Sequence, residues 1–272
     1  MKQMHLGLGT YTFPWNIMLS GSLSLHSFTF RDMLGFTADN NIRFFQFCDN
    51  YPLHLLTKNE RSALKKLAVE KNIQLQVGTR GLRFDHIIQY ISIASSLNAA
   101  FLRVVIDDEN YHPAEKDIIE IIRALLPSLK KAGIALAIEN HDRFKAKTLA
   151  AIINQTDAAS VAICLDTANS LGAGEGAGEI IPVLLPYTVN LHIKDFTIAR
   201  GRHKMGFTVS GAAAGKGMLD IPRLLNECSQ YERCSTATLE IWMDEEKTPE
   251  KTILKEMRQV KESIKYLKKY IS

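Results

Sequence analysis

Four consecutive apolar segments in the second half of the chain each carry one ionisable side chain near the end of the segment. Glu139 follows IALAI, Asp166 follows VAICL, His192 lies within VNLHIKD, and Glu240 lies within ATLEIWM. If these segments are neighbouring parallel strands, the four side chains meet at one rim of the sheet. Three carboxylates at one point repel one another, which raises pKa values unless a cation compensates them. We therefore expect these four residues to be ligands of one divalent metal ion, and Mn²⁺, Co²⁺, Mg²⁺ and Zn²⁺ all suit this donor set.

Each of these residues also has an ordinary structural explanation when it is taken alone. A glutamate at a strand end is commonly an ion-pair partner, and a histidine on an apolar strand is commonly a hydrogen-bonded core residue. Four such residues on four successive segments make four independent coincidences, so the pattern favours the metal site.

The elements that must position these side chains are visible as an alternation of two patterns. Short, mostly apolar segments are typical of strands that are buried on both faces of a parallel sheet. They cover residues 5–13, 44–49, 73–81, 101–107, 134–141, 161–169, 189–195 and 237–243. Between them, amphipathic segments predict helices over residues 30–39, 59–72, 85–97, 113–132, 147–154, 179–185, 221–230 and 249–270. Pro113 suits the first turn of its helix, and Gly133 suits the position that ends it.

This alternation recurs along the whole chain of 272 residues, and no Pro- or Ser-rich linker divides it. A closed (β/α)₈ TIM barrel typically needs about 250 residues. We therefore expect an α/β protein consisting of a single TIM-barrel domain over residues 1–272, with the active site at the carboxyl ends of the strands.

The composition is that of an ordinary globular protein, with 46% hydrophobic and 23% charged residues. A net charge of +4 is weak evidence for nucleic-acid binding and agrees with a small anionic substrate. The four cysteines show no CxxC spacing, and the chain has no apolar run of about 18 residues. The first residues lack the apolar segment of a signal peptide, so we expect none. We expect a cytoplasmic protein with neither a membrane nor a nucleic acid as partner.

Several motifs resemble those of the xylose isomerase-like TIM-barrel superfamily. They are IENH at 138–141, CLDTAN at 164–169, LHIKD at 191–195, the Gly-Lys-Gly turn at 215–217 with Asp220, and LEIW at 239–242. Tagatose and psicose 3-epimerases, hydroxypyruvate isomerase, inosose dehydratase and, more remotely, zinc-dependent AP endonucleases belong to this superfamily. The strand pattern covers the whole chain, whereas the specific motifs are confined to its second half.

The resemblance implies that Glu139, Asp166, His192 and Glu240 are the metal ligands. It also implies that Glu139 and Glu240 are the catalytic acid and base, which exchange a proton beside a metal-polarised carbonyl through an enediolate. A homodimer or homotetramer is implied by the resemblance alone.

One position departs from the pattern of the superfamily. Many members have Asp-x-x-His after the sixth strand, whereas this chain has Asp166-Thr167-Ala168-Asn169. Asparagine orients a substrate by hydrogen bonding and cannot shuttle a proton near neutral pH. This replacement counts against a second metal ion and against the endonuclease branch, and it makes a lyase a serious alternative to a 3-epimerase.

Further candidates for substrate binding surround the predicted metal site. Lys194 lies two residues after His192 and His141 two residues after Glu139, so the strand alternation directs them to the same side. Arg103 could meet a substrate anion or form a core ion pair, and Trp15 could form an apolar wall or simply pack. The long segment 196–217 carries Arg200, His203 and Lys216, among other basic residues.

Two glycine-containing segments invite a functional interpretation. Residues 196–217 could be a basic lid that contacts a carboxylate or phosphate, or a solvated surface loop. Residues 172–178 lack the Lys-Ser/Thr ending of a phosphate-binding loop, so we expect a mobile connection.

The favoured interpretation is a divalent-metal-dependent isomerase or epimerase of a small keto-sugar, sugar acid or sugar phosphate. The first alternative is a metal-dependent lyase, either a dehydratase or a decarboxylase, of an acidic keto-sugar derivative. The second is a non-catalytic sugar-binding barrel. The expected substrate-binding residues are His141, Asn169, Lys194, Arg200, His203, Arg103 and Trp15.

Overall fold

Eight parallel strands close into a barrel in the computed structural model, which describes residues 4–20, 28–201 and 203–272. The order around the barrel is β1-β10-β7-β6-β5-β4-β3-β2. The strands are β1 (His5–Gly9), β2 (Phe44–Phe47), β3 (Gln74–Arg80), β4 (Phe101–Val105), β5 (Ala135–Glu139), β6 (Val161–Asp166), β7 (Thr188–Ile193) and β10 (Thr236–Leu239). The predicted TIM barrel is confirmed.

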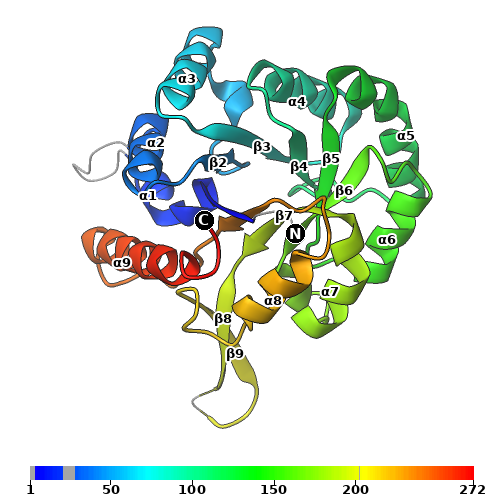
Figure 1. Ribbon diagram of the computed structural model, residues 1–272. Helices are drawn as coiled ribbons and strands as arrows, with labels where there is room; N and C mark the ends of the chain where they lie inside the picture. The colour runs from blue at the N-terminus through cyan, green and yellow to red at the C-terminus, as the bar shows by residue number, and fades with distance from the viewer. Residues whose placement is uncertain (1–3, 21–27, 202) are drawn as a thin grey trace.

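Nine helices surround the strands in the part of the chain that the structure describes (Figure 1). They are α1 (Pro14–Met18), α2 (Phe30–Asp39), α3 (Lys58–Glu70), α4 (Phe84–Ser96), α5 (Glu115–Ala132), α6 (Ala146–Asn154), α7 (Ala177–Leu184), α8 (Ile221–Cys228) and α9 (Pro249–Leu267). None of these helices combines the length and apolar character that crossing a membrane requires.

The sequence reads as buried strands because helices cover the outside of the barrel and side chains fill its inside. Every residue of β4 and of β6 is buried, which explains why these segments are apolar along their length rather than alternating. The strand register pairs Glu139 with Cys164 and Asp166 with His192, so the carboxyl ends of β5, β6 and β7 lie at the same rim of the barrel.

The ends of the elements differ from the predictions where capping decides them. Gly133 adopts a left-handed conformation with φ 65° and ends α5, as predicted. Pro113, however, is not in the first turn, because α5 begins at Glu115 with Ala114 as its N-cap. The predicted strand over 5–13 ends early, at Gly9, and a 3₁₀ turn follows over Thr10–Thr12.

The segment after β7 forms a hairpin rather than a loop. Strands β8 (Asp195–Arg200) and β9 (Phe207–Ala212) pair antiparallel and project from the barrel, as Figure 1 shows, while Arg202 lies outside the described residues. The Asp195 carboxylate fixes the base of this hairpin by accepting hydrogen bonds from the backbone amides of Gly215, Gly217 and Leu219 at 2.9–3.1 Å.

The glycine-containing connection at 172–178 is largely ordered by local structure. A 3₁₀ turn covers Asn169–Leu171, and α7 begins at Ala177 with Gly176 as its N-cap. The Glu179 carboxylate accepts a hydrogen bond from the Gly176 amide at 2.8 Å, which closes a capping interaction. The segment therefore leads directly from the site rim into a helix.

Candidate active site

The four residues predicted from the strand ends form one buried cluster at the rim of the barrel. Glu139 ends β5, Asp166 ends β6, His192 lies in β7, and Glu240 follows β10. None of the four is more than 3% exposed. His192 Nδ1 lies 2.9 Å from Glu240 Oε1 and 3.3 Å from Glu139 Oε2.

The cluster fits a divalent metal ion. Potential ligand atoms of Asp166, His192 and Glu240 all lie within 4.8 Å of one another. Asp166 Oδ2 and His192 Nδ1 are buried without a hydrogen bond, although such atoms normally have one. Three carboxylates and one imidazole nitrogen also form the kind of donor set that Mn²⁺, Co²⁺ and Zn²⁺ accept.

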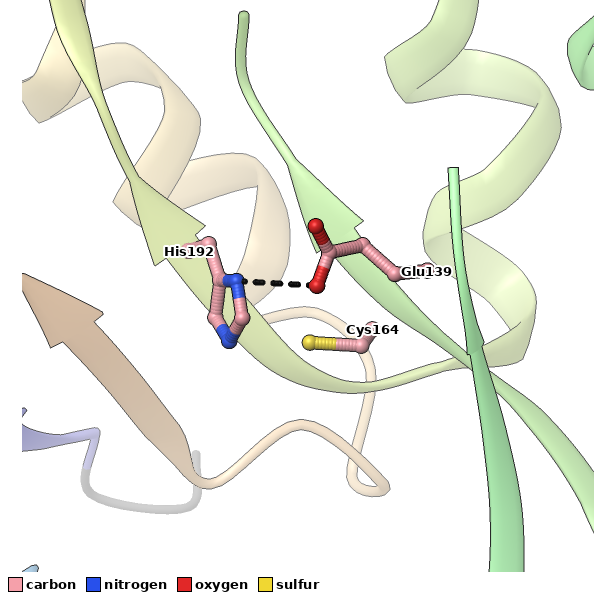
Figure 2. A group of neighbouring side chains, drawn as sticks. All are labelled: Glu139, Cys164 and His192. Carbon is pink, nitrogen blue, oxygen red and sulfur yellow. Dashed lines mark ion pairs between the residues drawn. The ribbon is translucent and has the colours of Figure 1, made fainter. Parts of the chain in front are cut away.

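A second group of possible ligand atoms lies one layer deeper in the barrel. Glu139, Cys164 and His192 also bring their ligand atoms within 4.8 Å of one another. Figure 2 shows the Cys164 thiol beside the His192 ring, while the Glu139 carboxylate contacts one ring nitrogen. Burial raises the pKa of the Cys164 thiol, so it behaves as the small neutral core residue that the sequence suggested.

The position of Asp166 is fixed by the backbone around it. Its Oδ1 accepts hydrogen bonds from the amides of Ala168 and Asn169, both at 2.7 Å. The Asn140 side chain brackets the strand end by donating to the Asp166 carbonyl at 2.8 Å and accepting from the Asp166 amide at 2.7 Å. Asp166 Oδ2 is therefore left directed at the cluster.

Arg103 is a buried cation beneath the cluster rather than an exposed anion-binding group. Its guanidinium forms ion pairs with Glu139 and, at 2.5 Å, with Asp49, and its side chain is only 2% exposed. Burial raises the pKa of Glu139, but Arg103 and His192 outweigh it and hold this pKa well below its ordinary range.

Asp49 extends the same ion-pair network to Arg80, which contacts it at 3.1 Å. Burial raises the pKa of Asp49, yet Arg103 and Arg80 together lower it to about 2. Asp49 was missed by the sequence analysis, although it follows the apolar segment FFQFC in the same way that Asp166 follows its own.

Lys194 supplies a second cation at the top of the cluster. Its Nζ lies 2.9 Å from Asp166 Oδ2, 2.9 Å from Glu240 Oε2 and 3.1 Å from Asn169 Oδ1. Burial raises the pKa of Glu240, but His192 and Lys194 lower it to about 2. Burial is the main cause of a raised pKa at Asp166.

Asn169 links Lys194 to Glu139. Its Nδ2 donates to Glu139 Oε1 at 2.9 Å, while its Oδ1 accepts from Lys194. The residue that departs from the motif of the superfamily therefore lies at the centre of the site, where it holds one glutamate and the lysine in fixed positions.

Two hollows above the cluster could receive a substrate, and Lys194, Val209 and Trp242 line both of them. The first has a volume of about 410 Å³ and also contacts His141 and Asn169. The second has a volume of about 330 Å³, and its further lining includes Trp15, Tyr11 and Glu240. Five of the predicted substrate-binding and catalytic residues thus line these two hollows.

Arg200 and His203 are placed elsewhere. Arg200 donates to the Lys204 carbonyl at 3.1 Å and stacks on Phe207, and His203 is exposed in the turn of the hairpin. The hairpin instead reaches the site through β9: Val209, Ser210 and Gly211 line the smaller hollow, and Val209 also lines the larger one. Substrate binding by Arg200 and His203 stays a prediction.

Comparison with known proteins places the chain among TIM-barrel enzymes. Residues 34–270 match the protein family described as "Xylose isomerase-like TIM barrel". The chain is 32% identical over 264 residues to 3-oxo-isoapionate decarboxylase of Pectobacterium atrosepticum, covering 97% of this chain and 95% of that protein.

Two solved structures share the fold at low sequence identity. A xylose isomerase domain protein from Planctomyces limnophilus is 16% identical with a TM-score of 0.73, and the match covers 98% of this chain and 97% of that one. A D-psicose 3-epimerase solved in the presence of D-fructose is 14% identical with a TM-score of 0.71, covering 97% of both chains.

Proposed function

Because the chain belongs to the xylose isomerase-like TIM barrel family, we propose that it is a divalent-metal-dependent lyase that decarboxylates a small 3-oxo sugar acid. The similarity to 3-oxo-isoapionate decarboxylase extends over nearly the full length of both chains, which supports this reaction class. The proposal takes up the lyase alternative in place of the isomerase interpretation.

The pairing of both glutamates with buried cations is the observation that carries the choice. Epimerisation needs one carboxylate that removes a proton and a second that returns one, each with a pKa near the working pH. Arg103 is bound to Glu139 and Lys194 to Glu240, so both carboxylates are held ionised and weakly basic. Decarboxylation requires no carboxylate base, because the leaving group is CO₂.

The reaction can be assigned to the residues of this site. When the bond to the carboxylate carbon breaks, its electron pair moves toward the 3-oxo oxygen, and the carbon is then protonated. The bound metal ion would supply Lewis-acid stabilisation of that oxygen from its four ligands Glu139, Asp166, His192 and Glu240. Lys194 neutralises charge beside the substrate, since it lines both hollows.

His141 is positioned to return the proton to carbon. It lines the larger hollow, and its Nδ1 lies 2.6 Å from Asp142 Oδ1, which fixes the ring and leaves Nε2 for the substrate. A histidine oriented by a carboxylate is the usual arrangement for a proton donor near neutral pH.

An isomerase or epimerase acting on a keto-sugar remains the second candidate. The presence of both Glu139 and Glu240 favours it, because that pair is the acid/base pair of the isomerases and epimerases in the superfamily. The likeness to the D-psicose 3-epimerase concerns the fold alone at 14% identity.

The test compares two product signals from the same metal-loaded protein in D₂O. One sample receives a 3-oxo sugar acid such as 3-oxo-isoapionate, and others receive D-fructose, D-psicose or hydroxypyruvate. We expect CO₂ release with deuterium incorporated at the former carboxyl-bearing carbon, and no exchange with the keto-sugars. Deuterium exchange or epimerisation without CO₂ release would overturn the decarboxylase in favour of the second candidate.

A further inference from the structure

A chain of buried amide side chains inside the barrel ends on the ring nitrogen of His192 that faces away from the cluster. His192 Nε2 lies 2.7 Å from Gln46 Oε1, while Nδ1 faces Glu139 and Glu240. Figure 2 shows the two nitrogens on different edges of the ring, one toward Glu139 and the other away from it. Gln46, Asn190 and His192 are all 0% exposed, so no solvent competes for these hydrogen bonds.

The orientation of the first amide is set by the backbone. Asn190 Nδ2 donates to the Thr236 carbonyl at 3.2 Å, and to the hydroxyls of Thr236 and Thr238 at 2.8 and 3.2 Å. A backbone carbonyl only accepts hydrogen bonds, so the NH₂ group of Asn190 must face it. Asn190 Oδ1 is therefore turned toward Gln46.

The second amide transmits this orientation to the histidine. Gln46 Nε2 donates to Asn190 Oδ1 at 3.2 Å and to Gln76 Oε1 at 3.3 Å, so Gln46 Oε1 faces the other way. An amide oxygen accepts and cannot donate, which requires the hydrogen of His192 to be on Nε2. The reversed amide would require a bare Nε2 and would place the hydrogen of a neutral ring on Nδ1, against the cluster.

We propose that Gln46 and Asn190 are positioning residues that fix His192 with its Nδ1 lone pair available to the metal ion. The inference rests on the proposed function, because it concerns the affinity of the same metal site. We call the hydrogen-bonded chain from Asn190 through Gln46 to His192 the relay. Gln46 lies on β2 and Asn190 on β7, so the relay joins strands that are not neighbours in the barrel. A hydrogen-bond partner on the second ring nitrogen orients a metal-binding histidine and strengthens its binding.

Gln46→Leu tests the relay, and Gln76→Leu is the matched control. Gln76 is also buried and contacts Gln46 and Thr236, but it has no hydrogen bond to His192 among the described contacts. The measurement is the dissociation constant of Mn²⁺ and Zn²⁺, obtained by competition with a chelating dye. We expect Gln46→Leu to weaken binding by about 10–100-fold and Gln76→Leu to change it only a few-fold.

Gln46→Glu separates positioning from packing. A carboxylate still accepts from Nε2–H, but its second oxygen faces the acceptors of Asn190 and Gln76. This variant should retain metal affinity within a few-fold of the parent while its free energy of unfolding falls. A loss of affinity equal to that of Gln46→Leu would contradict the role of the accepting oxygen.

Nitrogen-15 NMR of histidine-labelled, zinc-loaded protein reads the proton position directly, with His192→Gln used to assign the signal. The parent should show a protected hydrogen on Nε2 of His192, and Gln46→Leu should lose its protection. If the parent binds the metal ion, and Gln46→Leu has the same metal affinity and the same Nε2–H signal as the parent, the relay is contradicted but the metal site is not. A parent that binds no Mn²⁺ or Zn²⁺ overturns the relay together with the metal-dependent function.

Discussion

Replacement of Arg103 by methionine should destabilise the protein strongly, because Arg103 is the buried counterion of two carboxylates. Its guanidinium contacts Glu139 and Asp49 and donates to the Thr79 carbonyl at 3.3 Å. Methionine has a similar length and no charge, so Arg103→Met removes the ion pairs with little loss of volume.

The magnitude follows from the two carboxylates left behind. Removing one partner of a buried ion pair typically costs about 3–5 kcal/mol. The lowering of the Asp49 pKa from its ordinary 3.8 to about 2 corresponds to at most about 2.5 kcal/mol, at ~1.4 kcal/mol per pKa step. Arg80 also lowers the pKa of Asp49, so Arg103 accounts for only part of these ~2.5 kcal/mol. Most of the lost free energy of unfolding therefore comes from Glu139, because burial without Arg103 favours the neutral form of its carboxyl group.

The pH dependence has a definite sign. The pKa of Asp49 is depressed in the folded protein, so its contribution to stability is present above about 4 and is lost as the pH falls toward about 2. In Arg103→Met the folded pKa is less depressed, so the variant loses less stability between about pH 4 and pH 2 and its free energy of unfolding depends less steeply on pH in that range.

Urea unfolding monitored by circular dichroism from pH 7 down to pH 3 measures both effects. Arg83→Met is the matched control, because Arg83 pairs with Asp108 at 3.0 Å but its side chain is 45% exposed. An exposed pair contributes at most about 1 kcal/mol. If Arg103→Met lost no more free energy of unfolding than Arg83→Met, the buried ion-pair network would not have the role assigned to it.

Three further perturbations address other parts of the site. Asn169→Ala removes the link between Glu139 and Lys194, so substrate binding should weaken about tenfold, measured as KM for CO₂ release; an unchanged KM would contradict this. Asp195→Ala should lower the free energy of unfolding by about 1–3 kcal/mol and speed amide exchange at Gly217, and undisturbed exchange there would show that the carboxylate does not hold the hairpin. Glu240→Gln should abolish turnover and weaken Mn²⁺ binding, and near-full activity would remove Glu240 from the site.

The barrel could be predicted because each of its strands and helices leaves a pattern in a short segment of the sequence. Strands such as β4 and β6 are buried on both faces, so their sequences are continuously apolar and short. The four cluster residues could also be predicted from the sequence. Strand alternation and a shared rim place Glu139, Asp166 and His192 together, and no knowledge of side-chain packing is needed to see this. The predicted bounds of the helix at 30–39 agree with those of α2.

The partners of the cluster depend on contacts between distant strands, which periodicity does not encode. Arg103 meets Asp49 from a strand that is not its neighbour, and Gln46 reaches His192 across the barrel interior. The hairpin was missed although its two short strands partly alternate polar and apolar side chains, because the basic, glycine-containing turn between them is typical of a loop. Only the fold reveals that Val209, rather than Arg200, faces the site.

The metal content of the purified protein, measured by inductively coupled plasma mass spectrometry after dialysis against metal-free buffer, tests the central claim most directly. We expect about one equivalent per chain of Mn, Co, Zn or Mg in the parent and its loss in Asp166→Ala, because this substitution removes a carboxylate whose Oδ2 is directed at the cluster. A parent that contains no divalent metal, even after reconstitution, would mean that Arg103, Lys194 and His192 compensate the carboxylates by themselves. The metal-dependent lyase would then be contradicted.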